Sequence, residues 1–242
     1  MDMKKPLIYL EDITFSYPGS SPAIDKLNLK FYRGDRIGLV APNGSGKTTL
    51  FHIIMGLLKP SSGNMEIFGK PVKEERDFLI VRQRIGLLFQ DADDQLFSPT
   101  VLEDVAFGPL NLGKSKDEAI EISKRTLEFL GLAGFEDRIT FKLSGGEKRL
   151  VSLATILAME PEILLLDEPT TGLDNEIRVK ITQVLSDLDI SYILISHNID
   201  FLSNLTDSIY TMEKGKILLD KTVHIHEHLH AHPHGKYPHE HK

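Results

Sequence analysis

The feature that most constrains this chain is an apolar stretch that runs directly into a glycine-rich loop and then into a helical pattern. Residues 36–40 (RIGLV) predict a short strand, and residues 41–49 (APNGSGKTT) form the loop. After the loop, apolar residues recur at the spacing of one helix face, at Leu50, Ile53, Ile54 and Leu57. The order strand, loop, helix predicts an α/β fold in which the loop follows a core strand.

A loop of this composition can bind phosphate groups. Glycines let the chain curl so that several backbone N–H groups point into one small volume, and the following helix N-terminus favours negative charge. Lys47 can then reach the β- and γ-phosphates of a nucleotide, and the Thr48 hydroxyl can hold Mg²⁺. The residues expected to bind the nucleotide phosphates in this loop are Asn43, Gly44, Ser45, Gly46, Lys47, Thr48 and Thr49.

Position 41 departs from the strict pattern G-x-x-x-x-G-K-[ST], because alanine stands where the pattern has its first glycine. Alanine is acceptable where φ is negative, so we predict that Ala41 adopts an ordinary backbone conformation. The alternative interpretation is a glycine-rich turn without a ligand. The strand before the loop, the helix after it and the Lys-Thr pair favour phosphate binding.

The rest of the first half combines short strands with a helical insertion. Residues 7–31 contain strand-like stretches, in one of which Leu27, Leu29 and Phe31 alternate with polar neighbours, and residues 60–69 suggest a second antiparallel piece. A short apolar strand is predicted over 85–89. Residues 91–143 are mostly helical in pattern, with a capping box at Ser115 and Glu118 and an apolar face at Ala119, Ile122, Phe129 and Leu130 before Gly131.

The second half alternates between helices and strands. A capping box at Ser144 and Glu147 starts a helix that continues to Ala158. Residues 163–166 (ILLL) predict a strand that is buried on both faces. A helix over 177–188, a strand over 190–195, a helix over 199–205 and a hairpin at Lys214 and Gly215 complete an α/β pattern. From about Val223 onward, no core pattern remains.

Five further motifs follow the loop in a fixed order: a glutamine after an apolar strand (Gln90), LSGGE at 143–147, LLLDEPT at 164–170, TGLD at 171–174 and ISH at 195–197. Together they resemble the ATP-binding cassette (ABC) ATPases over roughly residues 6–220. In that family these motifs are the Q-loop, the signature, the Walker B strand, the D-loop and the switch histidine.

The resemblance implies a P-loop NTPase fold with a RecA-like parallel-sheet core, an antiparallel β subdomain and a helical subdomain at about residues 91–160. It also implies two regions. Residues 1–222 would be the ATP-binding domain, and residues 223–242 a histidine-rich tail.

The resemblance further implies roles for single residues. Asp167 would hold Mg²⁺, and the adjacent Glu168 would polarise the attacking water. Gln90 would link Mg²⁺ and water to the transporter contact, His197 would contact the γ-phosphate, and Tyr17 would stack on adenine. Each assignment has a structural alternative. The two acidic residues could be a solvated strand end, the histidine could be structural, and the tyrosine could be a core or surface residue.

Ser144 and Gly146 open a helix, so their N–H groups form a second anion site. In the family this site faces the γ-phosphate that the other protomer holds, so ATP binding closes a dimer and hydrolysis reopens it. Because Lys47, Glu168, His197 and the signature all occur in this chain, a homodimer would contain two competent sites.

Residues 89–101 (FQDADDQLFSPTV) and 103–109 (EDVAFGP) resemble the energy-coupling factor (ECF) importer ATPases, of which the cobalt and nickel systems are one branch. In these systems an ATPase pair drives a transmembrane coupling protein and a substrate-binding membrane protein. The resemblance therefore implies a peripheral protein on the cytoplasmic side of the cell membrane, with either a metal ion or a vitamin as substrate.

Composition excludes several other classes. The formal charge of −7 argues against a protein that coats nucleic acid, and zero cysteines exclude disulfides and thiolate chemistry. No apolar run approaches the length of a membrane span, and residues 1–6 lack a signal-type segment, so a soluble, intracellular chain is expected.

The histidines are concentrated beyond the core pattern. Eight of the ten lie within residues 224–242, six of them alternating with other residues at His224, His226, His228, His230, His232 and His234. Neutral imidazoles suit Ni²⁺ and Co²⁺, so the leading hypothesis is a metal-binding tail on a nickel or cobalt importer. A solvated tail and a purification tag are the alternatives.

Two other functions are weighed against transport. A soluble ABC ATPase that acts on DNA or ribosomes typically carries a long coiled coil or a second cassette, and the short distance between Gln90 and Ser144 leaves room only for a small helical subdomain. A P-loop kinase or GTPase has no role for the signature, the D-loop or the switch histidine.

Overall fold

The computed structural model describes residues 5–218, so the histidine-rich tail predicted at 223–242 lies outside the described residues. The first of its two sheets is antiparallel, as expected, and has the strand order β2-β1-β4-β5. Its strands are β1 (Ile8–Ser16), β2 (Pro22–Phe31), β4 (Ser62–Ile67) and β5 (Lys70–Pro71). Alternate side chains of β2, including Leu27, Leu29 and Phe31, are buried, which confirms the predicted half-buried strand.

The second sheet has six strands in the order β10-β9-β3-β8-β7-β6. All neighbouring pairs are parallel except β9 and β10, which form the predicted hairpin. The strands are β3 (Arg36–Val40), β6 (Ile85–Leu88), β7 (Ile163–Asp167), β8 (Ser191–Ile195), β9 (Ser208–Glu213) and β10 (Lys216–Leu218). Because Leu39 and Asp167 both pair with Ile195, the carboxyl ends of β3, β7 and β8 meet at one edge.

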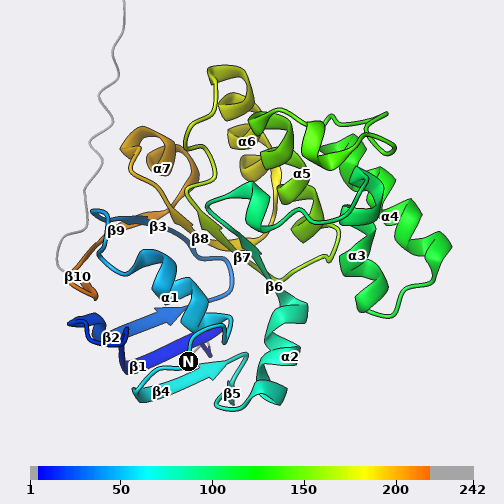
Figure 1. Ribbon diagram of the computed structural model, residues 1–242. Coiled ribbons are helices and arrows are strands. Elements are labelled where there is room, and N and C mark those ends of the chain that lie inside the picture. Colours follow the sequence, from blue (N-terminus) through cyan, green and yellow to red (C-terminus); the bar gives the residue numbers. More distant parts are fainter. Residues whose placement is uncertain (1–4, 219–242) are drawn as a thin grey trace, which may run out of the picture.

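Helices cover both faces of this second sheet (Figure 1). On one side, α1 lies between the two sheets, and on the other lie α5, α6 and α7, while α3 and α4 form a separate helical part beside α5. The bounds are α1 (Lys47–Ile54), α2 (Glu75–Arg84), α3 (Val101–Asn111), α4 (Lys116–Phe129), α5 (Gly145–Leu157), α6 (Asn175–Asp187) and α7 (Ile199–Leu205), with short 3₁₀ turns at Ala92–Asp94 and Thr140–Lys142.

The core is divided into two hydrophobic clusters by the second sheet. Ile163 and Leu165 of β7 point into the cluster that contains α1, whereas Leu164 and Leu166 point into the cluster that contains α5, α6 and α7. Successive side chains of a strand face opposite sides, so a strand that is buried on both faces must be apolar throughout. This geometry explains the continuous ILLL run and confirms the prediction made from it.

Two local expectations are wrong, and one helix was not predicted. Helix α2 is not predicted by the sequence pattern, because Phe78 and Val81 are buried while the neighbouring Leu79 and Ile80 are exposed, which obscures the helical period. Phe129, expected on the apolar face of α4, is 50% exposed, and Leu57 lies beyond the end of α1 and is also exposed. The capping boxes at Ser115 and Ser144 are both present as predicted.

Candidate nucleotide-binding site

The glycine-rich loop leaves β3 at the carboxyl edge of the sheet and leads into α1 with Gly46 as its N-cap. Gly46 has φ of +100°, and a Cβ atom there would lie 2.3 Å from the carbonyl oxygen of Ala23. Only glycine fits this position, both for its conformation and for its packing. Ala41 is buried and lies outside the positive-φ region, as predicted. The loop is thereby held tightly against β2.

Lys47 is buried at the start of α1, and its ammonium group turns back over the loop. Its Nζ donates to the carbonyl oxygens of Ala41 at 2.7 Å and Pro42 at 3.2 Å, and lies 3.5 Å from Nε2 of His197. Burial lowers the pKa of Lys47, while the nearby Glu168 and Asp167 carboxylates oppose that effect. Phosphate oxygens are stronger acceptors than these carbonyls, so an incoming nucleotide can compete for this ammonium group.

Asp167 ends β7 beside the glycine-rich loop. The Thr48 hydroxyl donates to its Oδ2 at 2.6 Å, whereas its Oδ1 is buried and has no hydrogen-bond partner among the described residues. A buried carboxylate oxygen without a partner is costly unless an ion completes it, so the donor set fits Mg²⁺. Thr48 and Asp167 would hold the ion, which would neutralise charge on the nucleotide phosphates.

The Asp167→Asn variant is expected to raise the melting temperature of the nucleotide-free chain. Burial raises the pKa of Asp167, so the folded state favours the protonated carboxyl, and stability falls as pH rises from the unfolded value through the folded one. At neutral pH an amide avoids this loss. A gain of 1 kcal/mol would shift the melting temperature by about 2–4 °C.

Thermal denaturation at pH 7 without Mg²⁺ measures this shift, and Mg²⁺-ATP provides the opposing condition. The wild-type chain should gain stability from Mg²⁺-ATP, and the variant should gain less. A variant that melts below the wild type without Mg²⁺ would contradict the expectation.

Glu168 follows Asp167 in a strained conformation, with φ of +49° and a buried side chain. Its Oε2 accepts a hydrogen bond from the Thr171 hydroxyl at 2.9 Å, and its Oε1 lies 3.1 Å from Nε2 of His197 without hydrogen-bond geometry. The His197 side chain is 51% exposed. A positive φ in a residue with a side chain costs roughly 1–3 kcal/mol and is most often retained at functional sites. In this conformation the carboxylate lies beside the imidazole of His197.

Tyr17 lies beside the loop, as the stacking hypothesis requires. Its hydroxyl is 3.1 Å from Oγ1 of Thr49, and its ring packs edge-on against Phe15 at 5.0 Å. The residue is 43% exposed, so part of it is accessible to a ligand.

A cavity of about 600 Å³ unites motifs that are far apart in the sequence. Thr48, Gln90, Gly145 and Thr171 all contribute to its wall. Ser144 is exposed at the N-cap of α5, where its hydroxyl accepts from the Glu147 N–H, while Gly146 packs closely on Ile177. The predicted signature therefore lies at the surface, on the same side as the glutamine.

Sequence reasoning missed Arg149, which contributes to this cavity wall, and Gln95, which follows the lining residues 89–94 in the chain. Arg149 is buried on α5 and donates to the carbonyl oxygens of Phe89 and Gln90. Gln95 donates to the carbonyl oxygen of Ser152 at 2.9 Å. One sequence signal could have found Arg149. It lies four positions before Leu153, on the buried face of α5, where the helical period predicts an apolar residue.

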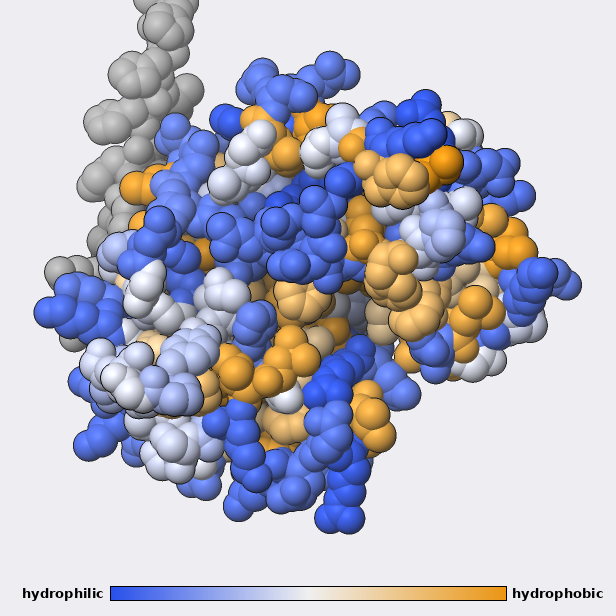
Figure 2. Space-filling model, in the orientation of Figure 1, coloured by the Kyte–Doolittle hydropathy of each residue, from blue (hydrophilic) through white to orange (hydrophobic). Residues whose placement is uncertain are grey.

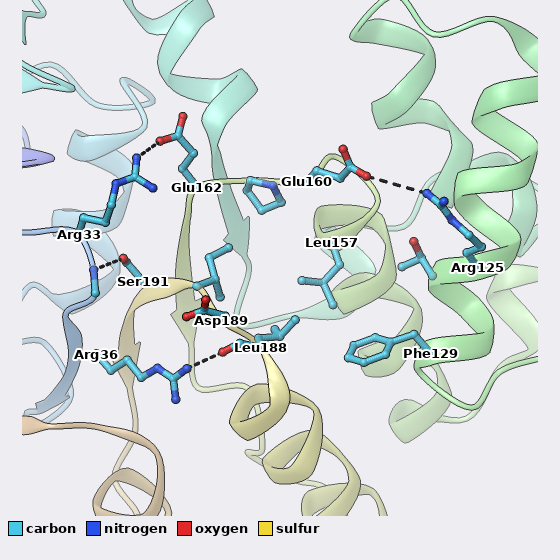
Figure 3. A pocket seen from close by; sticks show the side chains of 14 residues that line it. Arg33, Arg36, Arg125, Phe129, Leu157, Glu160, Glu162, Leu188, Asp189 and Ser191 are labelled. Atoms are coloured by element: carbon cyan, nitrogen blue, oxygen red, sulfur yellow. Dashed lines mark hydrogen bonds and ion pairs between the residues drawn. The ribbon is translucent and has the colours of Figure 1, made fainter.

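A second cavity, of about 670 Å³, lies at the amino ends of the parallel strands (Figure 3). In this view Arg33 pairs with Glu162 on the core side, and Phe129 and Arg125 project from α4 on the other. None of the predicted site residues lines it. Ligands of open parallel sheets bind at the carboxyl edge, which is where the glycine-rich loop, Asp167 and Glu168 lie.

Comparison with known proteins agrees with this geometry. A model of the ABC transporter family matches residues 24–171. The chain is 48% identical over 238 residues to a putative ABC transporter ATP-binding protein of Nitratidesulfovibrio vulgaris, covering 98% of this chain and 86% of the relative. It is 45% identical over 220 residues to an energy-coupling factor transporter ATP-binding protein of Methanothermobacter thermautotrophicus, covering 89% of this chain and 71% of the relative.

Solved structures share the fold. The cbiO1 protein of Clostridium perfringens, described as part of the ABC transporter complex cbiONQ, aligns with a TM-score of 0.79 and 34% identity over 89% of this chain and 88% of that one. A dimeric ATP-binding cassette bound to ADP and phosphate aligns with a TM-score of 0.80 and 27% identity, covering 89% of this chain and 97% of that one. The predicted ABC ATPase fold is confirmed.

The family match spans the glycine-rich loop and the Asp167-Glu168 pair, and the relatives match along nearly the whole described length. The chain therefore belongs to the ABC transporter family, as an ATP-hydrolysing subunit of the energy-coupling factor type.

Proposed function

We propose that this chain powers an importer of nickel or cobalt, with transport carried out by partner membrane proteins. The observation that carries the ATPase part is the meeting of Lys47, Thr48, Asp167, Glu168 and His197 at one sheet edge, through contacts of 2.6–3.5 Å. The metal assignment has separate support from the histidine-rich sequence after Val223. Vitamin uptake by the same ECF machinery is the competing substrate class.

In the proposed reaction, the loop residues 43–49 bind the phosphates and Tyr17 stacks on the adenine ring. Glu168 polarises the attacking water, because its carboxylate is held by the Thr171 hydroxyl and lies beside His197. His197 and Gln90 contact the γ-phosphate and the water. These roles agree with the burial of Glu168 and the partial exposure of His197.

The active unit is proposed to be a dimer, in which Ser144 and Gly146 of one protomer complete the ATP site of its partner. The start of α5 supports this arrangement, because Ser144 and Gly145 are exposed there and a helix N-terminus attracts anions. The similar dimeric cassette bound to ADP and phosphate is a second support. Two identical chains would provide two complete sites.

Partner membrane proteins are proposed to bind an exposed aromatic surface on the helical part. Within residues 5–218, no helix is long and apolar enough to cross a membrane. Figure 2 shows hydrophobic side chains gathered over the region of α3 and α5 on the right of the molecule. Phe97 and Phe141 of this part are 67% and 74% exposed, and Phe97 packs edge-on against Phe107 at 4.8 Å. An aromatic patch on a solvent-exposed face indicates an interaction site.

The buried Asp104 supports this surface from below. Its Oδ1 accepts hydrogen bonds from the backbone N–H groups of Phe97 at 3.1 Å and Ser98 at 2.9 Å, and its Oδ2 accepts from the Thr140 hydroxyl at 3.2 Å. Two aromatic loops are thereby fixed to α3. With this surface against membrane subunits, the chain would be a peripheral protein on the cytoplasmic side.

The deciding experiment is uptake of radiolabelled Ni²⁺ and Co²⁺ by cells that carry the chain with its membrane partners. Uptake should depend on ATP hydrolysis, so a Glu168→Gln chain expressed at the same level is the control. Uptake of a labelled vitamin with neither metal transported would instead support the competing substrate class.

The tail hypothesis predicts that metal binding depends on residues after Lys221. Among residues 5–218, no group of three or more histidine, aspartate or glutamate residues could hold a metal ion. Isothermal titration with Ni²⁺, Co²⁺ and Zn²⁺ should therefore show binding to the full chain and its loss in a chain that ends at Lys221. Protons compete for imidazole, so affinity should fall as pH drops through roughly 6.5. Equal metal uptake by both chains would contradict the hypothesis.

A further inference from the structure

Residues 89–95, here called the glutamine segment, are fastened to helix α5 by side chains from both sides. Arg149 donates through Nη1 to the carbonyl oxygen of Phe89 at 2.6 Å and through Nη2 to that of Gln90. Gln95 donates to the Ser152 carbonyl at 2.9 Å and lies 2.8 Å from the Thr155 hydroxyl. Bonds at these positions tie the segment along more than one turn of α5.

The glutamine segment is also closed upon itself. Gln95 accepts the backbone N–H of Phe89 at 3.2 Å through the same side chain that binds α5. At the exposed margin, Lys148 of α5 pairs with Asp93 at 2.5 Å. The two ends of the glutamine segment therefore cannot separate from α5 independently. A shift of Gln90 must be accompanied by a shift of the helix.

Among these side chains, burial of the charged Arg149 costs the most free energy. It is only 5% exposed, its Nε has no hydrogen-bond partner among the described residues, and no carboxylate forms an ion pair with it there. Burial lowers the pKa of Arg149, and only the more distant charges of Asp91 and Asp167 counteract this. An apolar side chain of similar volume would cost less free energy at such a position.

The position of Arg149 connects two parts of the site. On one side, the carbonyl groups that it binds flank Gln90, which shares a cavity wall with Thr48 and Thr171. On the other side, α5 begins at the Ser144 N-cap within two turns of Arg149, and no break interrupts the helix between them. An α-helix is stiff over this length, so displacement at Arg149 reaches Ser144.

We propose that Arg149 is a positioning residue that makes the placement of Ser144 depend on Mg²⁺-ATP at Gln90. The inference rests on the proposed function, because it assumes that Ser144 completes the partner's site. When Gln90 moves toward bound Mg²⁺-ATP, Arg149 draws α5 with it. Without that link, the nucleotide is still bound by residues 43–49, but the signature is no longer oriented for closure.

The chemistry requires arginine rather than any cation. A guanidinium group presents two N–H groups in a fixed fork and can donate to two neighbouring carbonyl oxygens at once. The single ammonium of a lysine is a point charge that would bind one of them well. Arg149→Lys should therefore retain part of the effect, and Arg149→Met should lose it.

The test compares Arg149→Met and Arg149→Lys in the full chain and, for trapped dimers, in a Glu168→Gln background. Fluorescent-nucleotide titration should give an ATP dissociation constant within about 3-fold of the parent chain. The dimer dissociation constant with Mg²⁺-ATP, measured by analytical ultracentrifugation, should rise roughly 3- to 30-fold for Arg149→Met, with a similar fall in kcat. Arg149→Lys should lie between this variant and the parent.

Arg36→Met is the matched control, because Arg36 also donates to a carbonyl oxygen, that of Leu188, but at the opposite sheet edge. It should lower the melting temperature without changing the dimer constant or kcat. Unchanged dimerisation in Arg149→Met would overturn the proposal, and so would loss of ATP binding in parallel with lost stability and no rescue by lysine. A parent chain that neither hydrolyses ATP nor dimerises would contradict the proposed function itself.

Discussion

Glu168→Gln is expected to lower kcat for ATP hydrolysis by roughly 10²- to 10⁴-fold, the usual contribution of a general base. Glutamine has the same shape and can still accept from the Thr171 hydroxyl, so the strained loop should keep its form. What is lost is the negative charge that polarises water. ATP affinity should change little, because the phosphate-binding groups belong to residues 43–49. Steady-state phosphate release and nucleotide titration measure the two quantities separately.

A second glutamate, at the other end of β7, provides the control. Glu162 lies just before β7, at the opposite edge of the sheet, where it pairs with Arg33 and Arg84 at 2.6 Å each. Glu162→Gln should lower stability modestly and leave kcat unchanged. Because ATP binding without hydrolysis should trap the proposed dimer, the Glu168→Gln chain should also sediment as a dimer with Mg²⁺-ATP. Hydrolysis at the wild-type rate would show that Glu168 is not the base.

Gly46→Ala is expected to damage both folding and nucleotide binding. The added Cβ would meet the Ala23 carbonyl oxygen at 2.3 Å and Ile24 Cδ1 at 2.9 Å, and the residue has φ of +100°. A backbone oxygen cannot move aside without shifting β2, so strain and overpacking together should lower the free energy of unfolding by roughly 2–6 kcal/mol. Urea denaturation and ATP titration of the folded fraction measure the effects.

Gly44 provides the comparison within the same loop. It also has a positive φ, +76°, but nothing lies within 4 Å of an added Cβ. Gly44→Ala should therefore lower the free energy of unfolding only through the positive φ, by roughly 1–2 kcal/mol. Equal losses for the two variants would mean that the contact with Ala23 does not restrict position 46.

The strands and helices that the sequence predicted best are those with one strong local cause. The RIGLV strand matches β3 residue for residue, and the helix over 199–205 matches α7, because each is bounded by turn or capping residues. Helix α2 escaped prediction because its exposed Leu79 and Ile80 break the apolar period. Phe129 was misassigned because its pattern fits an apolar face, whereas the structure leaves it lining the second cavity.

The motifs of the candidate site could be found from sequence, but their contacts could not. Thr48 and Asp167 are 119 positions apart, and it is the parallel register of β3, β8 and β7 that brings them within 2.6 Å. Arg149 carries no recognisable motif, because its role depends on two backbone carbonyl groups that no residue type encodes. Its buried position becomes visible only when α5 is packed against the glutamine segment.

The β9–β10 turn has a practical consequence for protein engineering. The N–H of Gly215 donates to the Ser45 carbonyl at 3.1 Å, and its carbonyl accepts from the Asp25 N–H at 3.1 Å. This turn therefore joins the glycine-rich loop to β2 directly. A reporter protein or affinity tag fused upstream of Leu218 would disturb the glycine-rich loop. A fusion at Lys221 would leave the contacts of Gly215 intact.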